Sequence, residues 1–98
     1  LRERIQQTRN RLATAAHHPR VWCCEWLEPL MAAGHWIPDL VEMAGGSDGL
    51  GAKGKDSVWL NWERVKAYDP EVIVVMPCSY SIPQILREQR RLTGRRGW

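Results

Sequence analysis

The sequence predicts an α/β fold, a three-layer lobe in which a small parallel sheet is flanked by helices. Two observations lead to this prediction. Runs rich in β-branched and aromatic residues at 21–27, 58–60 and 71–76 alternate with amphipathic segments, an order typical of parallel strands joined by right-handed crossovers. The chain has 98 residues, so it forms one domain at most and buries a small core.

An amphipathic helix is expected first. Ile5 and Leu12 fall at helical spacing from Leu1, with arginines between them. The helix should end near Ala16, because a proline that follows disfavours helical backbone at the residue before it. No capping residue precedes the helix, so we interpret residues 1–17 as the end of a longer helix.

The remaining elements are predicted from local signals. Glu28-Pro29 ends a strand and Gly45-Gly46 closes a helix, whereas residues 47–57 read as a glycine-rich loop. Ligands of parallel sheets bind at the C-terminal ends of the strands, which here are residues 26–31 and 77–80. The expected order is a buried strand at 21–27, a helix at 32–44 with Pro38 in its first turn, a short strand at 58–60, a helix at 62–68 capped by Asn61, a buried strand at 71–76, and a helix that starts at Ser81 or Ile82, runs through Leu92 and is terminated by Gly94.

The charge is divided unevenly along the chain. The net charge is +3, but four arginines against one glutamate make residues 1–19 basic, and five arginines against one glutamate make residues 87–98 basic. Residues 20–86 hold nine acidic and five basic side chains. Nucleic-acid binders gather their basic residues on the folded face itself, so we expect no nucleic-acid partner and interpret the terminal arginines as solvated helix faces.

Cysteine content and hydropathy bear on the compartment. The three cysteines cannot all pair within the chain, which favours a reducing environment. No apolar run reaches the roughly 18 residues of a membrane span, and the N-terminal segment is not a signal peptide. The residues therefore leave the compartment open.

The candidate catalytic patterns are weak. Cys23 and Cys24 are adjacent inside a predicted strand, and together with Glu25 and His35 they lack both the spacing of a zinc knuckle and the turn that exposes a nucleophile. The glycine-rich loop follows a helix and opens none, so it lacks the geometry of a phosphate cradle. We therefore expect buried, inert thiols, no resident cofactor and no enzymatic activity.

Two longer segments carry more specific information. They are EWLEPLMAAGHWIPDLVEMAGG, residues 25–46, and NWERVKAYDPEVIVVMPC, residues 61–78. In this order and at this separation they resemble the C-terminal lobe of cobalamin-binding proteins, the substrate-binding proteins of ABC importers whose two lobes are joined by a single helix. That family also includes siderophore- and metal-binding members. The resemblance covers about residues 18–90.

The resemblance has consequences for domain organisation. It implies that residues 1–17 are the end of the interlobe helix and that residues 18–98 are a partial C-terminal ligand-binding lobe. It also implies that an N-terminal lobe precedes Leu1 and that a further strand and helix follow Trp98, so the chain should be truncated at both ends. Alone it should bind weakly and could self-associate, since one wall of the cleft supplies part of the buried area.

The resemblance also implies a function and a site. The function is non-catalytic binding of cobalamin or a related corrinoid, and family members act outside the cytoplasm, in the periplasm or its equivalent. A corrin ring is wide, flat and mostly apolar, so aromatic and methionine surfaces suit it. The expected ligand-binding residues are Trp26, Met31, His35, Trp36 and Trp59. His35 could approach the cobalt ion, although a capping or hydrogen-bonding role near the helix start is the preferred interpretation.

Glu63 resembles the carboxylate with which these proteins dock onto a membrane permease. An ordinary first-turn acidic residue, stabilised by the helix dipole, is the alternative. Two other functions stay open: a siderophore- or haem-type chelate receptor of the same fold, and a standalone α/β interaction domain from a truncated gene.

Overall fold

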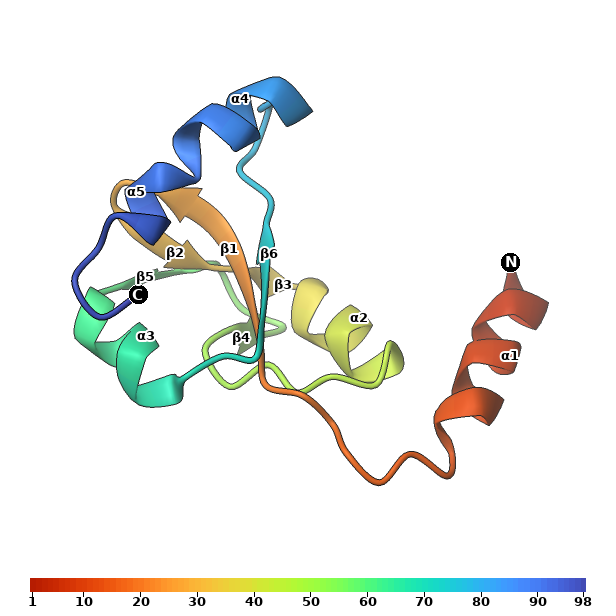
Figure 1. Cartoon of the computed structure of the whole chain (residues 1–98). Helices are drawn as coiled ribbons and strands as arrows, with labels where there is room; N and C mark the ends of the chain where they lie inside the picture. The colour runs from red at the N-terminus through yellow and green to blue at the C-terminus, as the bar shows by residue number, and fades with distance from the viewer.

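A four-stranded sheet in the order β5-β2-β1-β6 forms the centre of the computed structural model, which describes residues 1–98 (Figure 1). The helices lie on both sides of this sheet, and a separate two-stranded sheet joins β3 to β4. The strands are β1 (Val21–Leu27), β2 (Leu30–Ala32), β3 (Gly34–His35), β4 (Ala52–Lys53), β5 (Val58–Leu60) and β6 (Val72–Val75), and the helices are α1 (Arg2–Leu12), α2 (Ile37–Met43), α3 (Trp62–Tyr68), α4 (Ile82–Glu88) and α5 (Arg90–Thr93). The predicted α/β class, with a small sheet flanked by helices, is confirmed.

The main sheet is mixed, which corrects the expectation of a parallel sheet. Strands β1 and β6 pair in parallel from Val21↔Val72 to Cys24↔Val75. The β1–β2 and β2–β5 pairs are both antiparallel. The difference arises at Glu28-Pro29, which turns the chain back on itself, so that β1 and β2 form a hairpin.

The segment after that turn corrects the predicted helix at 32–44. Residues 30–32 alternate between buried and half-buried, the two-residue period of a strand, and the Ala33 amide donates to the Cys23 carbonyl at 3.1 Å. Helix α2 begins only at Ile37, with Pro38 in its first turn as expected. Pairing with both neighbouring strands therefore outweighs the helical pattern at the start of this segment.

Apolar residues fill both faces of the sheet. The larger cluster includes Trp22, Cys24, Leu27 and Leu30 and extends to Val65 of α3 and Leu92 of α5. The smaller cluster joins Val21, Cys23 and Ala33 to the half-buried Ile37, Val41 and Met76. Figure 1 shows α3, α4 and α5 on one side of β1 and β6, and α1 and α2 on the other. We call these the α3 face and the α2 face.

Most helix ends follow their local signals. The two exceptions are the division of the last predicted helix and the early end of α1. Asn61 caps α3 by accepting from the Arg64 amide at 2.8 Å, and Ser81 forms a capping box with Gln84. The expected helix from Ser81 to Leu92 is divided at Gln89 into α4 and α5, and Gly94 caps the second.

Helix α1 ends at Leu12, earlier than the expected Ala16, and buries none of its residues. The Leu12 side chain of α1 packs against Gly45. A Cβ atom at position 45 would lie only 2.7 Å from Leu12 Cδ2. Gly45 also has a φ of 94°, in the left-handed region that favours glycine, so this residue permits both the end of α2 and the approach of α1. None of the helices is both long and apolar enough to cross a membrane.

Candidate functional site

Three of the predicted ligand-binding residues are direct neighbours across the sheet. Trp26 on β1 pairs with Met31 on β2, and Met31 pairs with Trp59 on β5. Side chains of directly opposed residues stand on the same face of a sheet. We call Trp26, Met31 and Trp59 the platform.

A bulge in β1 places Trp26 on this face. Trp22 and Cys24 alternate into the core on the α3 face, and regular alternation would send Trp26 there too. The register between β1 and β2 shifts between Cys24 and Trp26, so Leu27 enters that core and Trp26 turns to the opposite face. Ser57 fixes the bulge by donating to the Glu25 carboxylate, with its hydroxyl 2.8 Å from Oε2.

The platform is partly exposed to solvent. Trp59 is 64% exposed, and Trp26 and Met31 are half-buried. Tyr80, which follows β6, packs edge-on against Trp26 with ring centroids 5.4 Å apart. The platform thus begins where parallel strands β1 and β6 end, the position at which ligands of α/β sheets bind.

A hollow of about 200 Å³ adjoins Trp26 and Tyr80 and has a polar wall. Glu28 lies 3.9 Å from Arg91 and 3.7 Å from Arg95, and Arg91 also pairs with Glu88. The hydrogen bond from Arg91 lowers the pKa of Glu88 and raises that of the arginine. Both arginines therefore lie against carboxylates. Sequence reasoning did not single out this wall, because it is built from residues far apart in the chain.

His35 and Trp36 form a separate exposed pair. Their ring centroids lie 5.7 Å apart, and His35 Nε2 is 3.9 Å from Asp56 Oδ1. Trp36 is 68% exposed at the start of α2. No aromatic ring pair joins either residue to Trp26 or Trp59, so the structure brings together three of the five expected ligand-binding residues and leaves these two beside one another.

The cysteines differ in their surroundings. Cys23 and Cys24 are buried, whereas Cys78 is exposed. Burial raises the pKa of the Cys24 thiol to about 12 and also raises that of Cys23. A thiol with a pKa as high as that of Cys24 carries almost no thiolate at neutral pH, and both residues are buried as expected.

Glu63 is exposed to solvent at the start of α3. Its side chain is 81% exposed in the first turn of α3 and forms an ion pair with Lys66 at 3.0 Å. Val65 on the same helix is buried, so the helix turns its apolar side to the core and Glu63 to solvent.

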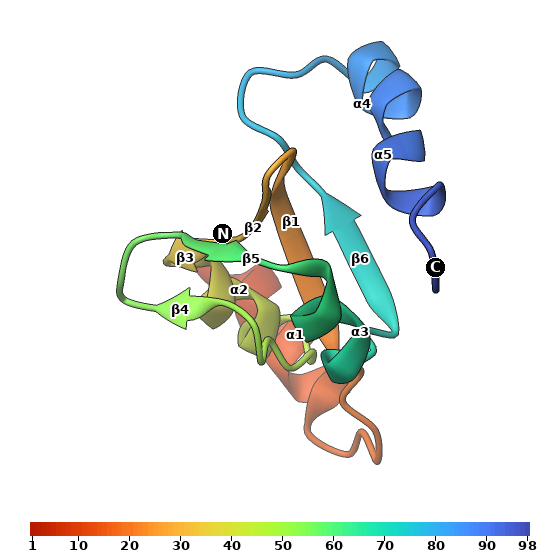
Figure 2. The same cartoon turned by 90° about the vertical axis from the view of Figure 1, so that its left-hand side faces the viewer.

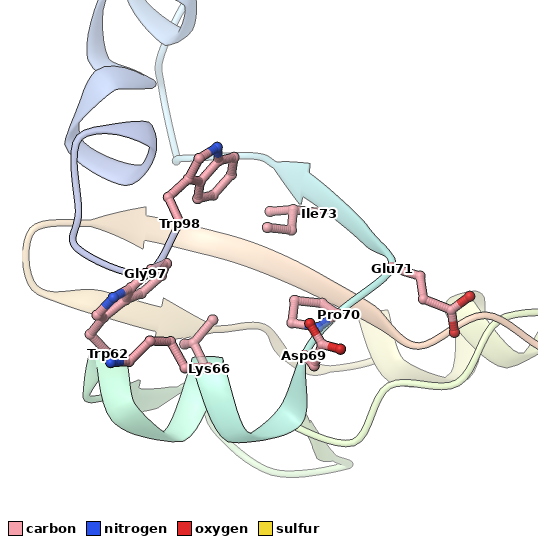
Figure 3. A pocket seen from close by; sticks show the side chains of 9 residues that line it. Trp62, Lys66, Asp69, Pro70, Glu71, Ile73, Gly97 and Trp98 are labelled. Atoms are coloured by element: carbon pink, nitrogen blue, oxygen red, sulfur yellow. The ribbon is translucent and has the colours of Figure 1, made fainter.

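A larger hollow, of about 500 Å³, lies elsewhere. Figure 3 shows it between α3, the start of β6 and the C-terminal residues. Trp62 and Trp98 stack there with centroids 6.4 Å apart, and Ile73 lines the sheet side. Because it opens on the α3 face and lies away from the platform, we do not assign it to the same site.

Solved structures share this fold. The chain superposes on the periplasmic vitamin B12 binding protein BtuF of Vibrio cholerae with a TM-score of 0.60 and 22% identity, over 74% of this chain and 29% of that one. A periplasmic binding protein from Veillonella parvula gives a TM-score of 0.78 and 17% identity, over 97% of this chain and 34% of that one. No protein-family model matches the sequence, and the curated proteins give no significant match.

The chain therefore spans about a third of the length of these similar structures. Both are binding proteins, and neither is an enzyme by its description. The likeness identifies the architecture: the chain has the fold of a lobe of a periplasmic binding protein.

Proposed function

We propose that the chain is a non-catalytic ligand-binding lobe and that its ligand is cobalamin or a related corrinoid. The observation that carries the proposal is the platform, a row of the half-buried Trp26 and Met31 and the exposed Trp59 across three adjacent strands. Two strand spacings are about 10 Å, a width that suits a flat macrocycle. The structural likeness to a vitamin B12 binding protein supports the same ligand.

The polar wall beside the platform fits the amide-rich rim of a corrinoid. The carboxylates of Glu28 and Glu88 and the guanidinium group of Arg91 line the hollow and can accept from and donate to neutral amides, without a net charge on the ligand. An anionic siderophore would require an unpaired cation, and Arg91 already lies against Glu28 and Glu88. A chelate receptor is therefore the second candidate.

We also propose that the lobe works with a second lobe and an importer, outside the cytoplasm. A platform on one wall buries one side of a ligand, so affinity should be low until another wall closes over it. Glu63 is the proposed contact with basic residues of a permease. His35 and Trp36 would extend the ligand contact at the start of α2. Of the proposed contact residues, only His35 carries an imidazole, the kind of side chain that coordinates cobalt.

Calorimetric titration with cyanocobalamin tests the ligand. We expect weak, saturable binding by the chain, and a loss of about fivefold or more in affinity for Trp59→Ala, because one large aromatic contact is removed. Trp98→Ala is the matched control, since Trp98 is 58% exposed but lies in the hollow on the α3 face. Absence of heat at millimolar ligand, or equal losses in the two variants, would overturn the proposal.

Charge reversal tests docking. Glu63→Arg should weaken coupling to the permease and leave cyanocobalamin affinity unchanged, and the coupling defect should fade as salt is raised. Glu42→Arg on α2 is the control, since that carboxylate is also exposed. The docking role would be contradicted if Glu63→Arg changed ligand affinity or if both variants impaired uptake equally.

A further inference from the structure

Glu25 is a charged side chain at the border of the platform that no cation neutralises. The residue is half-buried, and its carboxylate is bound by the Ser57 hydroxyl and forms no ion pair. We propose that Glu25, held in place by Ser57, is a specificity-determining residue of the platform. It accepts hydrogen bonds from amide N–H groups of the ligand and disfavours a ligand that presents a carboxylate there. This inference rests on the proposed function and selects between its two ligand classes.

Ser57 places the carboxylate on the platform face of the sheet. The connection from β4 to β5 turns back in a single loop, as Figure 2 shows, and Ser57 is its last residue before β5. Val58 packs against the core of the α3 face, so alternation directs Ser57 to the opposite face, together with Trp59. The Ser57 hydroxyl lies 2.9 and 2.8 Å from the two carboxylate oxygens of Glu25. These oxygens therefore lie on the platform face as well.

The hydrogen bond between Glu25 and Ser57 crosses strand β2. Glu25 belongs to β1 and Ser57 leads into β5, and β2 lies between these two strands. The register of both pairings puts the crossing at Ala32, whose side chain is buried in the core of the α3 face. On the platform face, Met31 lies on one side of the crossing and the buried Ala33 on the other. The carboxylate thus marks the border between the platform and the core under α2.

A carboxylate in these surroundings favours one class of ligand. Its oxygens only accept hydrogen bonds, and the single Ser57 proton leaves most of their lone pairs unused. A ligand on the platform would displace water from this border, and a charge that loses water requires a hydrogen-bond donor in exchange. The amides at the rim of a corrinoid supply such donors, whereas an anionic siderophore would place a second negative charge beside Glu25.

Glu25 differs in this respect from the neighbouring carboxylates. Glu28 in the polar wall lies 3.9 Å from Arg91, so its charge is balanced within the chain. Asp56, which precedes Ser57, has a side chain that is 98% exposed and lies 3.9 Å from His35. Glu25 has neither a cation nor full access to water, so it is the position at which the charge of a ligand should matter most.

Calorimetry with a matched set of ligands tests the inference. The set is cyanocobalamin and its monocarboxylic acids, in each of which one propionamide side chain is hydrolysed and an amide becomes a negative charge. We expect at least one acid to bind the unchanged chain about tenfold more weakly than cyanocobalamin, because it places a carboxylate against Glu25. Glu25→Gln should reduce this ratio to about twofold, since the new amide can donate to the acid and still accept from Ser57.

Three further variants separate contact, charge and position. Glu42→Gln removes one negative charge from α2, at a side chain that pairs with Lys53, and should leave the ratio unchanged. Ser57→Ala should lower the ratio, because the Glu25 side chain is then free to turn away from the border. Ser57→Thr keeps the hydroxyl and should restore the ratio of the unchanged chain.

The outcomes distinguish this inference from the proposed function. If the unchanged chain bound none of these compounds, the proposed function would fail and the role of Glu25 with it. If the chain bound cyanocobalamin no more tightly than every acid, or if the ratio persisted in Glu25→Gln or fell equally in Glu42→Gln, the role of Glu25 would be overturned and the platform would remain the ligand site. The comparison of ligands uses the unchanged chain, so it decides the question even where a variant does not fold.

Discussion

Trp22 and Trp59 lie on opposite faces of one sheet and in opposite surroundings. Trp22 is fully buried under the helices of the α3 face and donates its indole N–H to the Met31 carbonyl at 3.3 Å. Trp59 is 64% exposed on the face that α2 covers only in part. The comparison teaches that the two faces differ in closure: α3 and α5 close one over the core, and the other ends in the platform, which is the proposed binding surface.

Replacement of each tryptophan by alanine should give the largest difference in stability between the two faces. Trp22→Ala should cost about 3–5 kcal/mol, because it empties the centre of a packed core, and a loss of that size is a large share of the stability of a small domain. Trp59→Ala should change stability by about 0.5 kcal/mol or less. Urea denaturation followed by circular dichroism gives both values.

Trp22→Phe is the matched variant for the closed face. It keeps most of the ring volume but loses the hydrogen bond to Met31, so its cost should lie well below that of Trp22→Ala. Equal destabilisation by Trp22→Ala and Trp59→Ala would contradict the division between the faces.

Thiol reactivity compares a buried and an exposed side chain at a second pair of positions, Cys24 and Cys78. Cys78 is exposed, whereas Cys24 is buried with a pKa near 12. Iodoacetamide at pH 8 should therefore alkylate Cys78 at least about tenfold faster than Cys23 or Cys24, as peptide mass spectrometry can measure. In urea all three should react alike. Fast alkylation of Cys24 in the folded chain would show that the α3 face is not closed.

A smaller effect on stability is expected at Glu71, which directly precedes β6. Hydrogen bonds from His17 and from the Arg20 amide hold the pKa of Glu71 below its ordinary value. The stabilisation is therefore complete above the ordinary pKa of a glutamate, about 4.3, and is lost as the pH falls through the lower folded value. Glu71→Gln should lower the urea midpoint at pH 7 and have less effect at pH 3, with Glu3→Gln as the control. A larger effect at the lower pH would contradict this assignment.

Sequence patterns predicted the elements whose signals are local. The β-branched run at β6, the Asn61 cap and Pro38 in the first turn of α2 all act within a few residues, and each is found. Residues 32–35 were wrongly assigned to a helix, because the pairing of this segment with Val58–Leu60 and with β4 depends on chain more than fifteen residues away.

The site shows the same limit. Trp26, Met31 and Trp59 were named through a family resemblance, but their alignment on one face depends on the bulge in β1. No periodicity in the sequence marks that bulge. The contacts of Glu28 with Arg91 and Arg95 were missed for a similar reason, since α5 reaches the β1–β2 turn only in the folded chain.

The most direct test of the account follows the indole N–H signals of the six tryptophans by NMR during a titration with cyanocobalamin. This measurement detects weak binding and assigns it to a face. We predict that the signals of Trp26 and Trp59 shift and broaden progressively, while those of Trp22 and Trp62 stay in place. Shifts confined to Trp62 and Trp98, or no shift at millimolar ligand, would contradict the claim that the platform is the binding surface.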